Sequence, residues 1–307
     1  MQCIVVQGIE ISRLIMGSDY FDPEHIARVS QILDTYMSLG GNTIDTAHVY
    51  GGGNSEKALG LWMEARRNRN RVRILTKGAH HDAKGPRVNP RAIYDDLMAS
   101  LDRLRTDYVD LYALHRDDPS VQVGPILEAL NEHLDAGRIH AVGVSNWTHP
   151  RIAEANQYAS AHGLRGFSFS SPNLSLAKAI EPYWPGCVSA DAQTLLWHQR
   201  TQLPVLSWSS QARGFFTGRY TPQARGNADL VRVFYNDANW TRYYRAEQLA
   251  KEKGVSTIQI ALAYVLNQPF PTAAIIGAET EAELQSCRDG SEIELTSGER
   301  EWLDLVD

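Results

Sequence analysis

The chain has few cysteines and no long apolar run. Cys3, Cys187 and Cys287 are scattered, odd in number, and form no CxxC pair. A disulfide framework or a zinc site is therefore not expected, and a reducing, cytoplasmic location is. No stretch approaches the roughly 18 consecutive apolar residues of a membrane-spanning helix. The first residues, MQCIVVQGIEISR, lack the ordered basic, apolar and cleavage regions of a signal peptide.

An excess of positive charge is also missing. The formal net charge is −6, which disfavours binding to nucleic acid or to an anionic membrane surface. The one basic cluster, RRNRNRVR at 66–73, stands between a predicted helix and a predicted strand, so we interpret it as a solvated turn. The remaining composition, with 43% hydrophobic residues in 307, is that of a globular protein with a large core.

Short apolar strands alternate with amphipathic helices along the chain, and no change of composition marks a linker. Strands are predicted at 13–17, 42–45, 72–77, 109–115, 140–145, 166–170, 203–208 and 273–277. Helices are predicted near 24–38, 55–66, 90–104, 124–136, 149–161, 189–199, 242–252 and 256–267. The first of these strands lacks the GxGxxG fingerprint of an open dinucleotide-binding sheet. Eight strand–helix units in a chain of this length predict an α/β fold, a single (β/α)8 TIM barrel domain over 1–307.

The most informative segment is GNTIDTAHVYGGGNSE at 41–56, which places Asp45 at a strand end and Tyr50 five residues later. Lys77 ends the next strand, and His115 ends the one after it. Because the carboxyl ends of barrel strands form one rim, we expect these four side chains to meet there. A phenol with a pKa of about 10 needs a nearby ammonium to donate its proton near neutral pH. The set therefore suits carbonyl reduction, with Lys77 held by Asp45 beside Tyr50, and His115 orienting the carbonyl.

Each of these residues alone would usually be structural, but their order on successive strands is specific. The pattern DTAxxYGxGxSE, followed by a strand-final lysine and a strand-final histidine, resembles the aldo-keto reductase superfamily over almost the whole chain. The resemblance implies that the segments CIVV and IEIS form a hairpin at the barrel bottom. It also implies an NAD(P)-dependent oxidoreductase in which Tyr50 is the general acid or base, Lys77 and Asp45 tune it, and His115 orients the substrate.

Further segments match the family's cofactor-binding positions. In VGVSNW, the resemblance assigns Ser145 and Asn146 to the nicotinamide carboxamide. In LSWSSQARGFFTGRY it assigns Trp208 to stacking on the nicotinamide ring, with Ser209, Gln211 and Arg213 beside the pyrophosphate. In IIGAETEAELQSC it assigns the adenosine end to a last strand and helix that contain Gly277, Glu279, Glu283 and Cys287.

Two departures from the family pattern affect the cofactor. The usual glutamine on the sixth strand is absent, so Ser170 or Ser171 must complete the carboxamide site. Glu279 and Glu283 stand where the family often has basic residues, and a carboxylate repels a 2′-phosphate but accepts hydrogen bonds from a ribose 2′-hydroxyl. The resemblance favours NADP and these residues favour NAD, so both cofactors remain open.

Two other functions compete with this interpretation. A metal-dependent barrel hydrolase would use His48, His80, His81, Asp82 and His115, but the chain lacks a His-x-His pair on one strand, and Lys77 would repel a cation. A non-catalytic subunit of the same fold would bind a nucleotide and regulate a partner. The intact set of Asp45, Tyr50, Lys77 and His115 argues against it.

The substrate is the least determined property. A small carbonyl or alcohol compound is expected, with a sugar or polyol slightly favoured, and the sequence does not indicate an oligomeric state. The substrate-binding residues are predicted to be Tyr20, Trp147 and Trp184, and the wider lining adds Phe21, His81, Phe234 and Tyr235. Two long connections, 171–188 and 209–240, are expected to lie over the barrel mouth, where ligands are held.

Overall fold

A computed structural model describes residues 1–306 of the chain. Eight strands close into a barrel in the order β10-β3-β4-β5-β6-β7-β8-β9, and neighbours are parallel. The predicted α/β TIM barrel is therefore confirmed. The barrel strands are β3 (Leu14–Gly17), β4 (Thr43–Asp45), β5 (Arg73–Gly78), β6 (Val109–Leu114), β7 (Ile139–Ser145), β8 (Ser170–Ser171), β9 (Val205–Ser207) and β10 (Thr272–Ile276).

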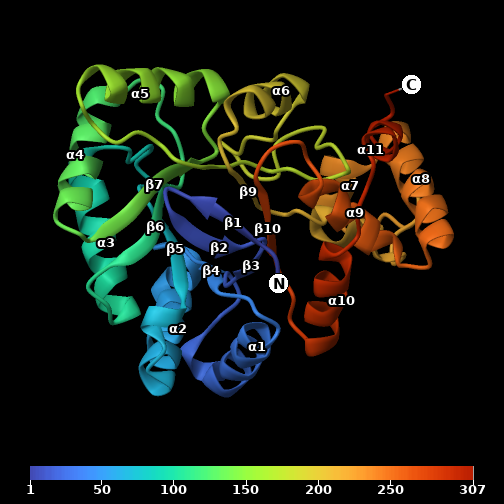
Figure 1. The fold of residues 1–307 in the computed structure, drawn as a ribbon, viewed down its shortest axis with the longest axis horizontal. Helices are drawn as coiled ribbons and strands as arrows, with labels where there is room; N and C mark the ends of the chain where they lie inside the picture. The colour runs from blue at the N-terminus through green and yellow to red at the C-terminus, as the bar shows by residue number, and fades with distance from the viewer. Residues whose placement is uncertain (307) are drawn as a thin grey trace.

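The helices lie around the outside of the barrel (Figure 1). Their apolar residues recur three and four apart, as in α1, where Val29, Ile32, Leu33 and Tyr36 are buried. The α-helices are α1 (Ile26–Ser38), α2 (Asn54–Arg66), α3 (Pro90–Leu104), α4 (Val123–Asp135), α5 (His149–Ala161), α6 (Ala192–Thr201), α7 (Ala228–Phe234), α8 (Asp237–Lys253), α9 (Thr257–Leu266), α10 (Glu281–Ser291) and α11 (Ser297–Leu303). Short 3-10 turns are η1 (Pro23–His25), η2 (Tyr50–Gly53), η3 (Arg69–Arg71) and η4 (Ala212–Thr217).

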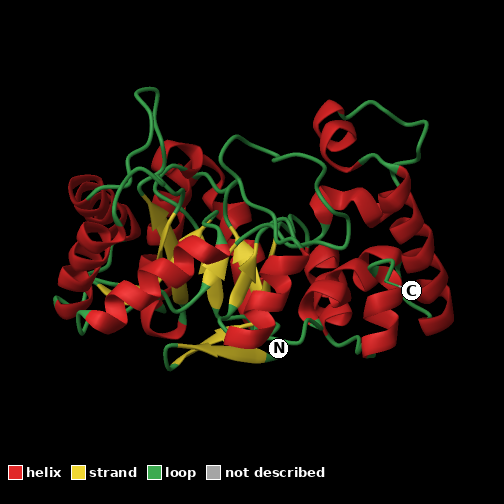
Figure 2. Ribbon diagram, turned by 90° about the horizontal axis from the view of Figure 1, so that it is seen from above, coloured by secondary structure: helices red, strands yellow, loops and turns green. Residues whose placement is uncertain are grey.

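An antiparallel hairpin closes one end of the barrel. Strands β1 (Cys3–Val6) and β2 (Ile9–Ser12) pair directly, and the turn between them is left-handed at Gln7 and Gly8. Val6 and Ile11 pack in the same apolar cluster as residues of the barrel strands. Figure 2 shows this hairpin across one end of the strands, with long loops gathered at the opposite end. The barrel mouth at that opposite end is thus left for the functional residues.

Three features depart from the predicted element boundaries. The strand expected at 166–170 is reduced to Ser170–Ser171, because Ser168 and Phe169 bond to β7 outside a regular ladder. The connection expected at 209–240 contains α7 and the start of α8, which begins at Asp237 rather than near 242. Helix α11 was not predicted. None of the helices in the described residues is long and apolar enough to cross a membrane.

Candidate active site

The four residues predicted for proton transfer meet at the barrel mouth. Asp45 ends β4, Tyr50 begins η2, Lys77 lies near the end of β5, and His115 follows β6. The Lys77 Nζ lies 2.6 Å from Asp45 Oδ1, and it donates a hydrogen bond of 3.1 Å to Tyr50 Oη. It also donates to the carbonyl of Thr46 at 2.9 Å. Three acceptors therefore fix one buried ammonium against the phenol.

Burial and charge act in opposite directions on this group. Burial lowers the pKa of Lys77, but the neighbouring Asp45 and Tyr50 outweigh burial and raise the pKa above its ordinary value. Lys77 therefore stays charged near neutral pH. Burial raises the pKa of Tyr50, and the Lys77 charge offsets only part of that rise. The phenol is therefore protonated near neutral pH, and Lys77 can stabilise the phenolate that forms when the proton is transferred.

The His115 ring lies edge-on to the Tyr50 ring, with centroids 5.6 Å apart. Burial lowers the pKa of His115 well below its ordinary value, and the charge of Lys77 adds to this shift. The imidazole is therefore neutral at pH 7. Its buried Nδ1 has no hydrogen-bond partner within residues 1–306. His80, which was not among the predicted catalytic residues, packs edge-on against His115 at 4.7 Å.

The turn that carries Tyr50 has a demanding backbone. Gly51, Gly52 and Gly53 adopt φ values of 56°, 62° and 96°, which glycine tolerates best. A Cβ on Gly53 would lie 2.5 Å from Cζ of Arg103, so this guanidinium packs directly on the turn. Arg103 also donates a hydrogen bond of 2.8 Å to the carbonyl of His48. The GGG sequence therefore lets α3 hold the segment before and after Tyr50.

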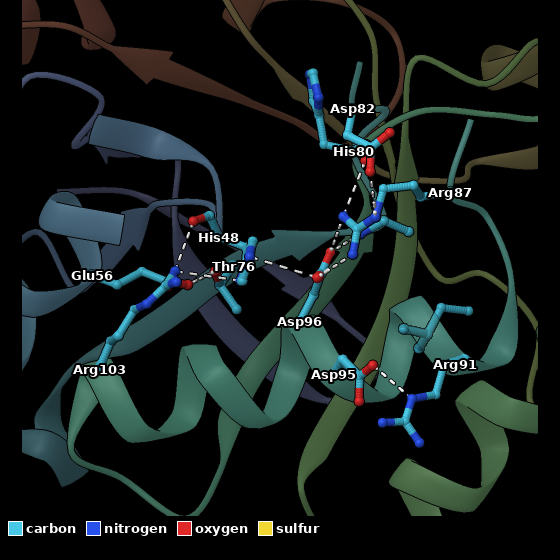
Figure 3. Close-up of polar contacts among 12 residues, drawn as sticks. His48, Glu56, Thr76, His80, Asp82, Arg87, Arg91, Asp95, Asp96 and Arg103 are labelled. Carbon is cyan, nitrogen blue, oxygen red and sulfur yellow. Dashed lines mark hydrogen bonds and ion pairs between the residues drawn. The ribbon is translucent and has the colours of Figure 1, made fainter. Parts of the chain in front are cut away.

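A buried polar network extends from this turn to the loop after β5 (Figure 3). Arg103 contacts Glu56 Oε2 at 3.2 Å, and Thr76 donates to the other oxygen of Glu56 at 2.6 Å. Asp96 on α3 accepts from Arg87 at 2.8 Å and from the Ala79 N–H at 2.8 Å. Asp96 also lies 3.6 Å from His48 Nε2. Residue types alone gave no signal for this network, because its pairs are 9 to 55 positions apart.

Ser145 at the end of β7 and Asn146 directly after it are buried and organised around the end of β8. Ser145 Oγ donates to the carbonyl of Ser171 at 2.9 Å, and Asn146 Nδ2 donates to Ser145 Oγ at 3.0 Å and to the carbonyl of His115 at 3.2 Å. Ser170 is buried nearby on β8. The buried Oγ of Ser171 has no partner among the described residues. This hydroxyl could form a hydrogen bond with the carboxamide of a nicotinamide, and the surrounding side chains are polar as well.

The segment after β9 forms a turn with spare hydrogen-bond donors. Ser209 and Arg213 have positive φ values of 48° and 50°, and the Trp208 indole Nε1 lacks a partner in the part of the chain described. The exposed Arg213 guanidinium stacks on the Tyr183 ring at 4.7 Å and also lies over Trp184. This turn, beside a guanidinium that has no carboxylate partner among the described residues, suits a pyrophosphate.

The residues predicted for the adenosine end lie after β10, but the structure gives both glutamates protein partners. Glu279 pairs with Arg28 at 2.8 Å, and Glu283 accepts from the Glu279 N–H at 2.8 Å at the start of α10. Gly277 is exposed. Cys287 Sγ contacts Gln211 Oε1 at 3.6 Å, which joins α10 to the turn after β9. Arg28, on α1, is a basic residue at this end that the sequence analysis missed.

The predicted substrate residues separate into two groups. Trp184 is 44% exposed, and its ring centroid lies 6.0 Å from that of Trp208, so it presents an aromatic surface near the turn after β9. Tyr20 is half-buried and donates to the carbonyl of Ala278 at 2.5 Å, in the segment after β10. Trp147 is 2% exposed, and its indole donates to the carbonyl of Arg116. This burial leaves Trp147 without a surface that a substrate could contact. The same holds for Phe21 and Phe234.

The histidines considered for a metal site do not form one. Within the described residues, no group of three or more His, Cys, Asp or Glu side chains is arranged to hold a metal ion. His48 instead contacts Asp96 and Arg103, and His80 uses Nδ1 on the carbonyl of His81. Their side chains are thus engaged in holding the loops around Tyr50 and His115.

Comparisons with known proteins find relatives over most of the chain. Norsolorinic acid reductase B of Aspergillus parasiticus is 30% identical, over 95% of this chain and 80% of that protein. The aldo-keto reductase YhdN of Bacillus subtilis is 26% identical, over 97% of this chain and 91% of that protein. The solved structure of the thermostable aldo-keto reductase Tm1743 covers both chains fully, with a TM-score of 0.78 and 24% identity, which supports the fold.

The model of the Aldo/keto reductase family matches residues 13–306, nearly the whole chain. The relatives named above are reductases, and an aryl-alcohol dehydrogenase of Pestalotiopsis microspora is 25% identical over 87% of this chain and 69% of that protein. The family generally uses NAD(P)H, and its substrates are small carbonyl compounds and alcohols. The chain is therefore an oxidoreductase enzyme that belongs to the aldo/keto reductase family.

Proposed function

We propose that this enzyme interconverts a carbonyl compound and its alcohol by hydride transfer, with Tyr50 as the proton donor and acceptor. The observation that carries the proposal is the contact of one buried ammonium with both Asp45 at 2.6 Å and Tyr50 at 3.1 Å. A phenol placed beside a fixed positive charge is suited to general acid catalysis. The unpartnered Ser171 hydroxyl and the turn after β9 support a nicotinamide dinucleotide beside it.

The roles of the residues follow from their contacts. A bound reduced nicotinamide would supply the hydride. Tyr50 gives its proton to the alkoxide oxygen that develops on the substrate, and Lys77 stabilises the resulting phenolate. Asp45 keeps Lys77 in position and balances its charge. His115 is neutral, and it orients the carbonyl oxygen by a hydrogen bond. In the reverse direction the phenolate accepts the proton of the alcohol.

We propose an aromatic carbonyl as the preferred substrate class. The exposed face of Trp184 beside Trp208 supports this proposal, as does a relative named as an aryl-alcohol dehydrogenase. Sugar carbonyls are the competing class, because an aromatic wall also packs on sugar faces.

The test is a panel of aromatic aldehydes, sugar aldehydes and the matching alcohols, each assayed with NADPH and with NADH. We expect the aromatic aldehydes to have the highest kcat/KM. A higher kcat/KM for the sugar aldehydes would contradict the proposed substrate class but not the proposed carbonyl reduction. Cofactor binding without turnover of any compound would contradict the proposed reaction and favour a regulatory role.

A further inference from the structure

Arg116 directly follows His115 and is the most deeply buried arginine of the described chain. It is 8% exposed, and no other arginine in residues 1–306 is buried to this extent. Its Nη1 donates a hydrogen bond of 2.9 Å to the carbonyl of His115. Its Nε is buried and has no hydrogen-bond partner within residues 1–306. The guanidinium therefore stands beside the proposed proton-transfer site with most of its donors unused.

Arg116 also lacks a carboxylate partner, unlike five other arginines that are partly buried. A carboxylate oxygen lies within 4 Å of Arg69, Arg87, Arg103, Arg151 and Arg242. No carboxylate of the described residues lies that close to Arg116. The adjacent acid, Asp117, faces Arg151 at 3.5 Å instead. A buried cation without an anion is strongly unfavourable, so a fold keeps one where something else supplies the negative charge.

The surroundings of Arg116 lead toward the substrate. Burial lowers the pKa of both His115 and His80, and the charge of Arg116 contributes to both shifts. The guanidinium is thus close enough to act on both rings. On its other side, Gly186 has a φ of 74°, and a Cβ there would lie 3.5 Å from Cδ of Arg116. The loop 171–188 therefore folds closely over this side chain, and the same loop carries Trp184.

Charges near the reacting carbonyl are unevenly balanced. Lys77 is neutralised by Asp45, and the exposed Asp19 acts on Tyr50 and Asp45 from the loop after β3. Arg116, beside His115, has no carboxylate within 4 Å among the described residues, and its charge helps to lower the pKa of His115 after the larger effects of burial and Lys77. The side of the site that faces Arg116 therefore carries a positive charge without a protein counter-ion. An anionic group on a ligand would fit there, and a cationic group would be repelled.

We propose that Arg116 binds a carboxylate of the substrate, so that the preferred substrates are carbonyl compounds that carry a carboxylate a few bonds from the reacting carbon. The planar guanidinium presents parallel N–H groups that match a carboxylate. This inference rests on the proposed carbonyl reduction and specifies its substrate. Arg116 acts in binding and takes no part in proton transfer.

The test compares two aldehydes with the same ring, 4-carboxybenzaldehyde and the neutral methyl 4-formylbenzoate. In the wild type we expect kcat/KM to be at least about tenfold higher for the carboxylate, the effect of one well-placed charged hydrogen bond. In Arg116→Gln the preference disappears, through a higher KM for the carboxylate, while kcat for the ester stays within about threefold. Arg116→Lys keeps the positive charge but loses the paired N–H groups of the guanidinium, so it should retain part of the preference for the carboxylate aldehyde.

The control is Arg91→Gln on the exposed face of α3, where the side chain is 83% exposed and far from any role in the site. It leaves the ratio of the two aldehydes unchanged. Equal kcat/KM values for the two aldehydes in the wild type would overturn the inference without any variant. A ratio that is the same in the wild type and in Arg116→Gln would overturn it as well. In both cases the proposed reaction would still be supported if the wild type reduces the ester and Tyr50→Phe does not.

Discussion

The two sides of the barrel mouth satisfy their polar groups differently. At the ends of β4 and β5, charges are buried and paired within the protein, as Lys77 is with Asp45 and Asp96 is with Arg87. Beyond β8, β9 and β10, polar atoms such as Ser171 Oγ and Trp208 Nε1 lack partners, and charges such as Glu279 are exposed. The first side is rigid before any ligand arrives. The second side is completed by what it binds.

The sharpest test of this difference is Tyr50→Phe. The change removes only the hydroxyl that accepts from Lys77, and it leaves the cofactor side unaltered. We expect kcat to fall by about 10²–10⁴-fold, the usual cost of losing a general acid. Cofactor affinity, measured by quenching of tryptophan fluorescence, should stay as in the wild type. Retention of more than about a tenth of the activity would contradict the role of Tyr50.

Lys77→Met should lower the rate by about 10²-fold and move the pH profile. Burial raises the pKa of Tyr50, and Lys77 opposes that rise, so removing Lys77 raises the pKa further. Reduction needs the protonated phenol. The pH above which the reduction rate falls should therefore be higher in the variant than in the wild type. Alcohol oxidation needs the phenolate, so its onset should shift to higher pH too. An active variant with an unchanged profile would show that Lys77 does not tune Tyr50.

The network on α3 offers a matched pair of substitutions with a smaller effect. Asp96→Asn removes a buried carboxylate that serves Arg87, Ala79 and His48, and it should destabilise the fold by about 2–3 kcal/mol. Asp95→Asn breaks only an exposed pair with Arg91 and should cost less than about 1 kcal/mol (Figure 3).

Urea unfolding of both variants measures this difference. We also expect Asp96→Asn to reduce kcat for the proposed reaction more than it alters cofactor affinity, because it loosens the loops beside Tyr50 and His115. Equal destabilisation by the two substitutions would mean that the catalytic side is no more tightly organised than the helix surface.

The sequence predicted the barrel and the convergence of these strand-end residues, for a physical reason. Strand ends in a parallel barrel converge, so Asp45, Lys77 and His115 could be placed from their strand positions alone. The network of Asp96, Arg103 and Glu56 could not, because the contacts depend on how α3 packs against the turn after β4. Burial was the other quantity that the sequence did not give. Trp147 is in the core and Trp184 is exposed, although both were predicted to contact the substrate.

The adenosine end gives the smallest expected effect. Glu279 is paired with Arg28, and both side chains are more than half exposed, so solvent screens their charges. Glu279→Arg removes the negative charge, adds a positive one and frees Arg28. We expect the ratio of kcat/KM with NADPH to that with NADH to rise by roughly fivefold to tenfold, equivalent to about 1 kcal/mol.

The control for this prediction is Glu281→Arg, which makes the same charge change in the first turn of α10. Glu281 accepts from Gln31 and Thr35, and it has no contact with Arg28. If the glutamates only stabilise the positive end of the helix dipole, both substitutions should lower stability slightly and neither should alter the cofactor ratio. A shift confined to Glu279→Arg would place that residue beside the ribose. The wild type could also prefer NADPH by more than about a hundredfold, with a preference that Glu279→Arg does not change. The 2′-phosphate would then bind at a site that Glu279 does not influence, and the glutamate would act only on the helix dipole.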